Sequence, residues 1–135
     1  MTENVILLVE DCTEDASLVM RAFKKWGITN TIHVAADGEQ AVEAASTLRP
    51  SIVILDVHLP GITGFDAARQ ILKTSPDLLI LILSIHDDPR YADAARDCGA
   101  RGFLNKCNAD EFLIPAISAL LRGELYFPQL ATDEP

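Results

Sequence analysis

Uninterrupted apolar runs alternate with amphipathic stretches along this chain. Residues 5–9, 52–55 and 78–83 are apolar throughout, which is typical of strands buried on both faces of a parallel sheet. Residues 31–35 and 101–104 are weaker segments of the same kind, and we interpret them as two further short strands. The pattern therefore predicts five strands.

Apolar residues recur at helical spacing between these strands. The spacing predicts helices over residues 13–26, 37–48, 64–73, 88–98 and 108–122. A strand followed by a helix, five times over, predicts a doubly wound, five-stranded parallel sheet with helices on both faces, an α/β fold. We expect one domain over residues 1–122 and a linker or tail over residues 123–135.

The ends of the helices carry their own signals. Asp37 is expected to cap the second helix, and Asn108 with Glu111 forms a capping box for the last one. Pro115 cannot donate a hydrogen bond to the carbonyl of Glu111. We therefore expect the last helix to be kinked or to begin late, near Asp110.

Polar side chains with a shared chemistry follow four of the predicted strands. Glu10 and Asp11 follow the first, Asp56 ends the third, Ser84 ends the fourth and Lys106 follows the fifth. The carboxyl ends of parallel strands lie at one edge of the sheet, where ligands bind in this class of fold. Crowded carboxylates repel one another, and Mg²⁺ relieves that repulsion. A carboxylate, a metal, an ammonium and a hydroxyl together predict phosphoryl transfer, with Asp56 as the acceptor.

Composition narrows the class of protein. The chain has 135 residues, 49% of them hydrophobic, so a disordered protein is not expected. The apolar runs are too short to cross a bilayer, and residues 1–4 lack the basic start of a signal peptide. The net charge of −9 argues against nucleic-acid binding by this domain itself. Three cysteines without a Cys-x-x-Cys pair indicate reduced thiols, and we expect a cytoplasmic protein.

Several motifs occur in order, each at a predicted strand end. They are Ile6-Leu7-Leu8-Val9-Glu10-Asp11, Leu55-Asp56-Val57-His58-Leu59-Pro60-Gly61, Ile82-Leu83-Ser84 and Gly99-Ala100-Arg101-Gly102-Phe103-Leu104-Asn105-Lys106. On these motifs, residues 4–122 resemble the receiver domain of two-component response regulators, a flavodoxin-like (CheY-like) three-layer sandwich. Residues 113–127 look like receivers that precede a helix-turn-helix DNA-binding domain.

The resemblance implies roles for particular residues. Asp56 would accept a phosphoryl group from a histidine kinase or phosphotransfer protein. Glu10, Asp11 and Asp56 would hold Mg²⁺ with the backbone carbonyl of His58. Ser84 and Lys106 would bind the phosphoryl group, and Ser84 with Phe103 would form the switch. That switch implies a change in partner binding or a homodimer through the fourth helix, fifth strand and fifth helix. The domain would be regulatory, supporting its own phosphorylation and dephosphorylation, and not an enzyme.

Two alternatives stay open at this point. A Mg²⁺-dependent phosphohydrolase would use an aspartyl phosphate on a similar sheet, but such enzymes resemble each other in a second Asp two residues after the nucleophile. This chain has His58 there. A degenerate receiver would act only as a protein-binding module. It would have lost a member of the acid pair, Asp56 or Lys106, and all are present.

Overall fold

Five strands and five helices alternate along the chain. The computed structural model describes residues 5–86 and 88–127. Residues 1–4, Asp87 before the fourth helix and residues 128–135 of the predicted tail lie outside this part. The elements are β1 (Ile6–Val9), α1 (Thr13–Lys25), β2 (Ile32–Ala35), α2 (Gly38–Leu48), β3 (Ile52–Asp56), α3 (Gly64–Thr74), β4 (Leu79–Ser84), α4 (Pro89–Asp97), β5 (Gly102–Asn105) and α5 (Ala109–Leu121).

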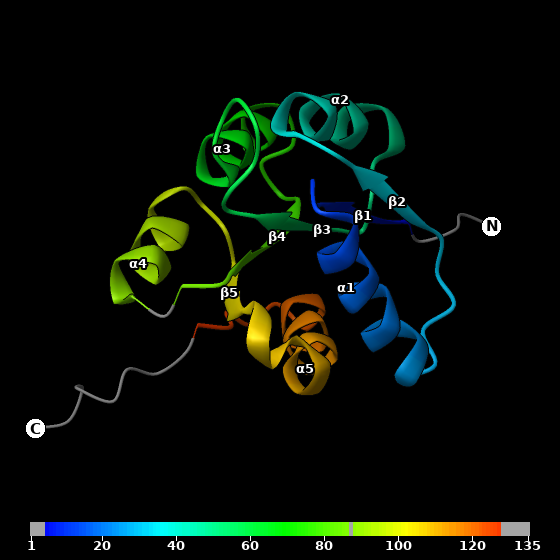
Figure 1. Cartoon of the computed structure of the whole chain (residues 1–135). Coiled ribbons are helices and arrows are strands. Elements are labelled where there is room, and N and C mark those ends of the chain that lie inside the picture. The colour runs from blue at the N-terminus through cyan, green and yellow to red at the C-terminus, as the bar shows by residue number, and fades with distance from the viewer. Residues whose placement is uncertain (1–4, 87, 128–135) are drawn as a thin grey trace, which may run out of the picture.

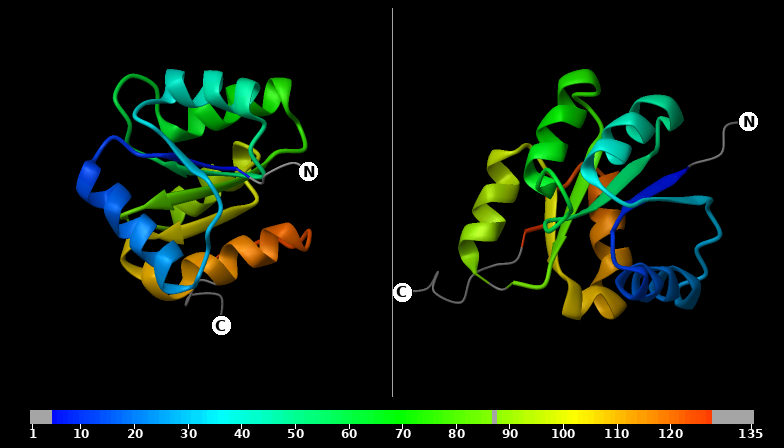
Figure 2. Two further views of the ribbon diagram at one scale, coloured as in Figure 1. Left: turned by 90° about the vertical axis from the view of Figure 1, so that its right-hand side faces the viewer. Right: turned by 45° about the horizontal axis from the view of Figure 1, so that its top comes forward.

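The strands form a single parallel sheet between two layers of helices. The strand order is β2-β1-β3-β4-β5, and every described pairing between these strands is parallel. Helices α2, α3 and α4 cover one face, and α1 and α5 cover the other (Figures 1 and 2). The predicted doubly wound sheet is confirmed.

Alternate strand residues face the two helical layers, and this produces two apolar cores. Leu7, Val53 and Ile82 pack in the core beneath α2, α3 and α4. Leu8 and Ile54 pack in the core with residues of α1 and α5. Because the central strands are buried on both sides, they are apolar throughout, which is the pattern seen in the sequence. In the described part of the chain no helix combines the length and the apolar character needed to cross a membrane.

One predicted helix end is confirmed, and the predicted start of the last helix differs from the structure. Asp37 caps α2 as predicted, its Oδ1 accepting from the amide of Gln40 at 2.8 Å. Asn108 makes no side-chain cap, because a 3-10 turn at Lys106–Asn108 already precedes α5 and Asn105 caps that turn instead. The expected late start near Asp110 is wrong: α5 begins at Ala109 and continues through Pro115.

The segment after α5 returns to the sheet. Tyr126 forms a parallel bridge with Gly102 on the outer strand β5. The amide of Phe103 donates to the carbonyl of Tyr126 at 2.9 Å, and the amide of Tyr126 donates to the carbonyl of Arg101 at 3.0 Å. A Cβ on Gly102 would lie 3.1 Å from the Tyr126 carbonyl oxygen, so glycine leaves room for this approach. Tyr126 therefore covers the first part of the free edge of the sheet, at residues 101–103.

Candidate functional site

Strand register brings the predicted acids to the same level. Val9 of β1 pairs with Leu55 of β3, so Glu10 and Asp56, the next residues, end up side by side. In this strand order the chain turns to opposite faces after β1 and β3, and ligands bind in the crevice at such a switch point. Carboxylate oxygens of Glu10, Asp11 and Asp56 lie within 4.8 Å of one another.

Buried polar side chains concentrate at this edge. Among residues 5–86 and 88–127, the buried polar or charged residues are Glu10, Asp56, Ser84 and Lys106. Each was predicted from the sequence as part of the site. Burying charged groups costs free energy unless they are paired, so this cluster indicates a functional site.

The ammonium of Lys106 lies among three carboxylates. Its Nζ is 2.7 Å from Glu10 Oε1, 2.8 Å from Asp15 Oδ2 and 3.1 Å from Asp56 Oδ1. The side chains of Glu10, Asp56 and Lys106 are almost fully buried, and that of Asp15 is partly exposed. Lys106 therefore compensates charge on the same acids that the sequence assigned to a metal.

Burial and charge displace the pKa values in this cluster. Burial raises the pKa of Asp56 and of Glu10, and the opposing attraction of Lys106 does not fully offset it. Burial alone would lower the pKa of Lys106, but its contacts with Asp15, Glu10 and Asp56 outweigh burial and raise that pKa. Lys106 is therefore protonated, and burial makes the ionised forms of Glu10 and Asp56 less favourable than they are in water.

The acid cluster suits a divalent cation. Glu10 Oε1 is buried and pairs with the Lys106 ammonium at 2.7 Å. Three carboxylates whose oxygens lie within 4.8 Å of one another match the hard oxygen ligands that Mg²⁺ and Ca²⁺ take. The structure also leaves Asp11 exposed, so the cluster opens to solvent on one side.

A close backbone approach fixes the loop that follows Asp56. The amide of Gly64 donates to the carbonyl of Val57 at 2.8 Å. A Cβ on Gly64 would overlap the carbonyl oxygen of Asp56 and would lie 2.9 Å from its carbonyl carbon. Glycine at this position therefore allows α3 to start directly against the backbone of the proposed acceptor.

Two histidines and a tyrosine lie beside Ser84. The Ser84 hydroxyl oxygen accepts from the amide of His86 at 3.0 Å. The His86 ring stacks on Tyr91 with centroids 4.8 Å apart, and the His58 ring meets His86 edge-on at 5.0 Å. His58 is exposed, whereas His86 is half-buried in this aromatic group.

Phe103 is the residue that the resemblance assigned to the switch together with Ser84. Phe103 is already buried, with 4% of its surface exposed. It packs in the core that includes Ala92 of α4, and Phe127 packs against the same core. The ring therefore lies inside the core in this conformation, and the switch role of Phe103 with Ser84 stays a prediction.

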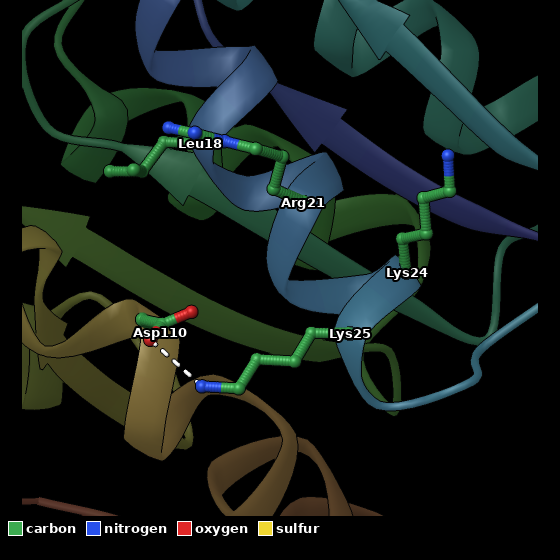
Figure 3. Close-up of a pocket in the computed structure, with 5 residues that line it drawn as sticks. All are labelled: Leu18, Arg21, Lys24, Lys25 and Asp110. Atoms are coloured by element: carbon green, nitrogen blue, oxygen red, sulfur yellow. Dashed lines mark hydrogen bonds and ion pairs between the residues drawn. The ribbon is translucent and has the colours of Figure 1, made fainter.

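A surface hollow of about 520 Å³ lies elsewhere, between α1 and α5. Arg21, Lys24 and Lys25 line it with Leu18 and Asp110 (Figure 3). Lys25 Nζ is 3.0 Å from Asp110 Oδ2, and the Trp26 indole donates to the Asp110 carbonyl at 3.3 Å. These contacts join the end of α1 to the start of α5. None of the buried acids lines this hollow, so we do not place the chemistry there.

Sequence reasoning missed two residues near the site. Asp15 is in the first turn of α1, and this position after the acid pair was a signal that we did not use. Tyr91 is in α4, and only folding places it against His86. Gly64 was predicted as a helix start, without its approach to Asp56.

A family assignment follows from comparison with known proteins. The family model described as the response regulator receiver domain matches residues 6–118. The chain belongs to this family. It is the receiver domain of a two-component response regulator.

Curated relatives extend the comparison. The chain is 35% identical over 118 residues to the DNA-binding transcriptional activator EvgA of Escherichia coli K12, covering 85% of this chain and 58% of that protein. It is 36% identical over 90 residues to the transcriptional regulatory protein DegU of Brevibacillus brevis, covering 67% of this chain and 38% of that protein. The chain therefore matches well under two thirds of the length of either relative. These relatives are regulators.

Solved structures agree on the fold. A LuxR-family two-component response regulator from Aurantimonas sp. SI85-9A1 superposes with a TM-score of 0.85 at 29% identity, covering 93% of this chain and 89% of that one. The signal receiver domain of the response regulator NarL from Mycobacterium tuberculosis gives a TM-score of 0.82 at 26% identity, covering 92% and 100%.

Proposed function

We propose that Asp56 is the phosphoryl acceptor of this receiver and that a histidine kinase or phosphotransfer protein is the donor. The observation that carries the proposal is the ammonium of Lys106, 3.1 Å from Asp56 Oδ1, within an otherwise acidic buried cluster. A cation at this position can attract the oxygens of an incoming phosphoryl group. A purely structural ion pair would not require two further acids beside it.

The proposed step transfers one phosphoryl group. A carboxylate oxygen of Asp56 forms a bond to phosphorus, and the P–N bond to the donor histidine breaks. The bonding electrons leave on the imidazole nitrogen, which takes a proton. Lys106 and the Ser84 hydroxyl then hold phosphoryl oxygens; the hydroxyl accepts from His86 and so keeps its own proton free for donation.

Mg²⁺ is the proposed cofactor. Glu10, Asp11 and Asp56 would hold it, with the backbone carbonyl of His58 as a further ligand. When bound, the ion supplies positive charge for the phosphoryl oxygens. In the structure Glu10 and Asp56 both pair with the ammonium of Lys106.

The proposed output passes through α4, β5 and α5. Ser84 ends β4 beside β5, and Ser84 pairs with Asn105 in register. Phosphorylation would alter partner binding or homodimer formation on this face, where Tyr126 lies against β5. The chain matches 58% of the length of EvgA, which is a DNA-binding transcriptional activator. For the whole protein we therefore propose control of transcription through a DNA-binding partner domain. The net charge of −9 argues against direct nucleic-acid contact by this domain.

The end of the receiver domain and the cellular location of the protein are also proposals. We propose that the receiver unit extends past the boundary expected at residue 122 and includes residues 123–127, and the bridge between Tyr126 and Gly102 supports this. We propose a cytoplasmic location. Cys12, Cys98 and Cys107 are all free thiols, which fits a reducing compartment.

The test uses a small phosphodonor. The chain is incubated with acetyl phosphate and Mg²⁺, and its intact mass is measured. We expect a single phosphoryl mass gain that disappears with a chelator and in Asp56→Asn, the isosteric control. Retention of the full gain in Asp56→Asn, or no gain in the wild type, would refute the assignment of Asp56. The same gain would show that the domain supports its own phosphorylation.

A further inference from the structure

Asp15 holds Lys106 from outside the acid cluster. The Lys106 ammonium donates a hydrogen bond to Asp15 Oδ2 at 2.8 Å. Glu10 and Asp56 also pair with this ammonium, and both belong to the group of acids that could hold a metal. Asp15 does not belong to that group. It can therefore keep its contact with Lys106 when a metal takes the other two.

The local structure keeps Asp15 in place. It lies in the first turn of α1, where the positive end of the helix dipole favours a carboxylate. Its side chain is 39% exposed, whereas that of Lys106 is 7% exposed. The contact therefore reaches from the solvent side of α1 into the buried site.

We propose that Asp15 is a positioning residue that holds the Lys106 ammonium and sets the balance between metal binding and phosphoryl binding at the site. This inference rests on the proposed function of Asp56 as acceptor. Asp15 does not touch the reacting atoms; it acts through Lys106.

Removing the charge of Asp15 has opposite effects on the two ligands. Without Asp15, Lys106 pairs more closely with Glu10 and Asp56, and the site has one negative charge fewer. Both changes weaken Mg²⁺ binding. When Mg²⁺ occupies the site, Glu10 and Asp56 would bind the ion instead of Lys106; without Asp15 the lysine is then freer to bind phosphoryl oxygens, and the incoming anion meets less repulsion. Both of these changes strengthen phosphoryl binding.

The experiment compares Asp15→Asn with a matched control. Glu14→Gln removes the same charge one residue earlier in the same turn, from an exposed side chain, and Glu14 makes no ion pair within residues 5–86 and 88–127. Asp15→Glu keeps the charge and should restore wild-type behaviour. Calorimetry measures Mg²⁺ alone, and then beryllofluoride at saturating Mg²⁺ as a stable phosphoryl analogue.

We expect Asp15→Asn to bind Mg²⁺ about two- to fivefold more weakly, and beryllofluoride more tightly by a similar factor. Glu14→Gln should change the affinity for Mg²⁺ and the affinity for beryllofluoride by smaller factors. A merely structural role would weaken both ligands together, and that result would overturn the inference, as would equal behaviour of the Asp15→Asn and Glu14→Gln variants. If wild type binds no beryllofluoride, the proposed function fails and this inference fails with it. If wild type binds beryllofluoride and Asp15→Asn does not combine weaker Mg²⁺ binding with tighter beryllofluoride binding, only this inference fails.

Discussion

The amide of Phe103 donates a hydrogen bond of 2.9 Å to the carbonyl of Tyr126, across the outer edge of the sheet. Phe103 occupies the position that the family resemblance assigned to an aromatic switch. Tyr126 belongs to the segment that the sequence assigned to a linker or tail. The backbone of the proposed switch residue is therefore joined to the chain that leads out of the domain.

Truncation tests this edge contact. A chain ending at Arg122 loses the two backbone hydrogen bonds of Tyr126 and should be less stable by roughly 1–3 kcal/mol. It should also self-associate, because an uncovered edge strand pairs with other chains. A chain ending at Phe127 is the control. Urea unfolding and sedimentation measure both effects, and equal stability with a monomeric shorter chain would contradict the prediction.

Removing the Lys106 charge should destabilise the metal-free protein more than removing the Asp56 charge. We expected the empty site to be strained by repulsion among its acids, but Lys106 pairs with Glu10 and Asp56 in the structure. Lys106→Met leaves two buried carboxylates without this cation and should cost about 3–5 kcal/mol. Asp56→Asn removes an acid whose pKa is raised by burial, so its stability should match or exceed that of wild type.

Urea unfolding with and without Mg²⁺ measures this difference. Millimolar Mg²⁺ should recover part of the stability of Lys106→Met, because the ion replaces the missing positive charge. A Lys106→Met variant as stable as wild type without metal would show that the ion pairs do not support the fold. Trp26 lies at the end of α1 remote from the site, so calorimetry is preferable to its fluorescence for metal binding.

The raised pKa values of Glu10 and Asp56 set the sign of a pH dependence. The folded protein holds these protons more tightly than the unfolded chain, whose values are near 4.5 and 3.8. Their contribution to stability is present below those values and is lost as the pH rises through the raised folded pKa. The metal-free wild type should therefore gain stability relative to Asp56→Asn as the pH falls from 7 towards that window. Thermal melts of both proteins measure the difference, and a constant gap across this range would contradict it.

Gly64→Ala should disturb the acceptor itself. The added Cβ would overlap the carbonyl oxygen of Asp56, so the backbone must shift, at a cost of about 1–3 kcal/mol. Phosphorylation by acetyl phosphate should fall with it. Gly61→Ala is the control in the same loop: its φ of +85° makes alanine strained, but nothing lies within 4 Å of the new atom. Both variants should lose stability, and only Gly64→Ala should lose phosphorylation; equal phosphorylation in the two would contradict the close-approach argument.

The sequence by itself determined the order of the helices and strands and which polar residues lie at the carboxyl ends of the strands. Strands buried on both faces are apolar throughout, so β1, β3 and β4 were visible as runs, and a parallel sheet necessarily gathers Glu10, Asp56 and Ser84 at one edge. Local rules also located the Asp37 cap correctly. They failed at Asn108, because whether a 3-10 turn precedes α5 depends on how β5 ends against its neighbours.

Only the tertiary structure decided how charge is shared within the site. Helical spacing places Asp15 in the first turn of α1, but its contact with Lys106 joins residues far apart in the chain and depends on how α1 packs against the sheet. The same holds for Tyr126 on β5 and for the burial of Phe103. Such contacts depend on three-dimensional packing and not on periodicity, because an ion pair or an edge bridge imposes no repeat on the sequence that could be recognised in advance.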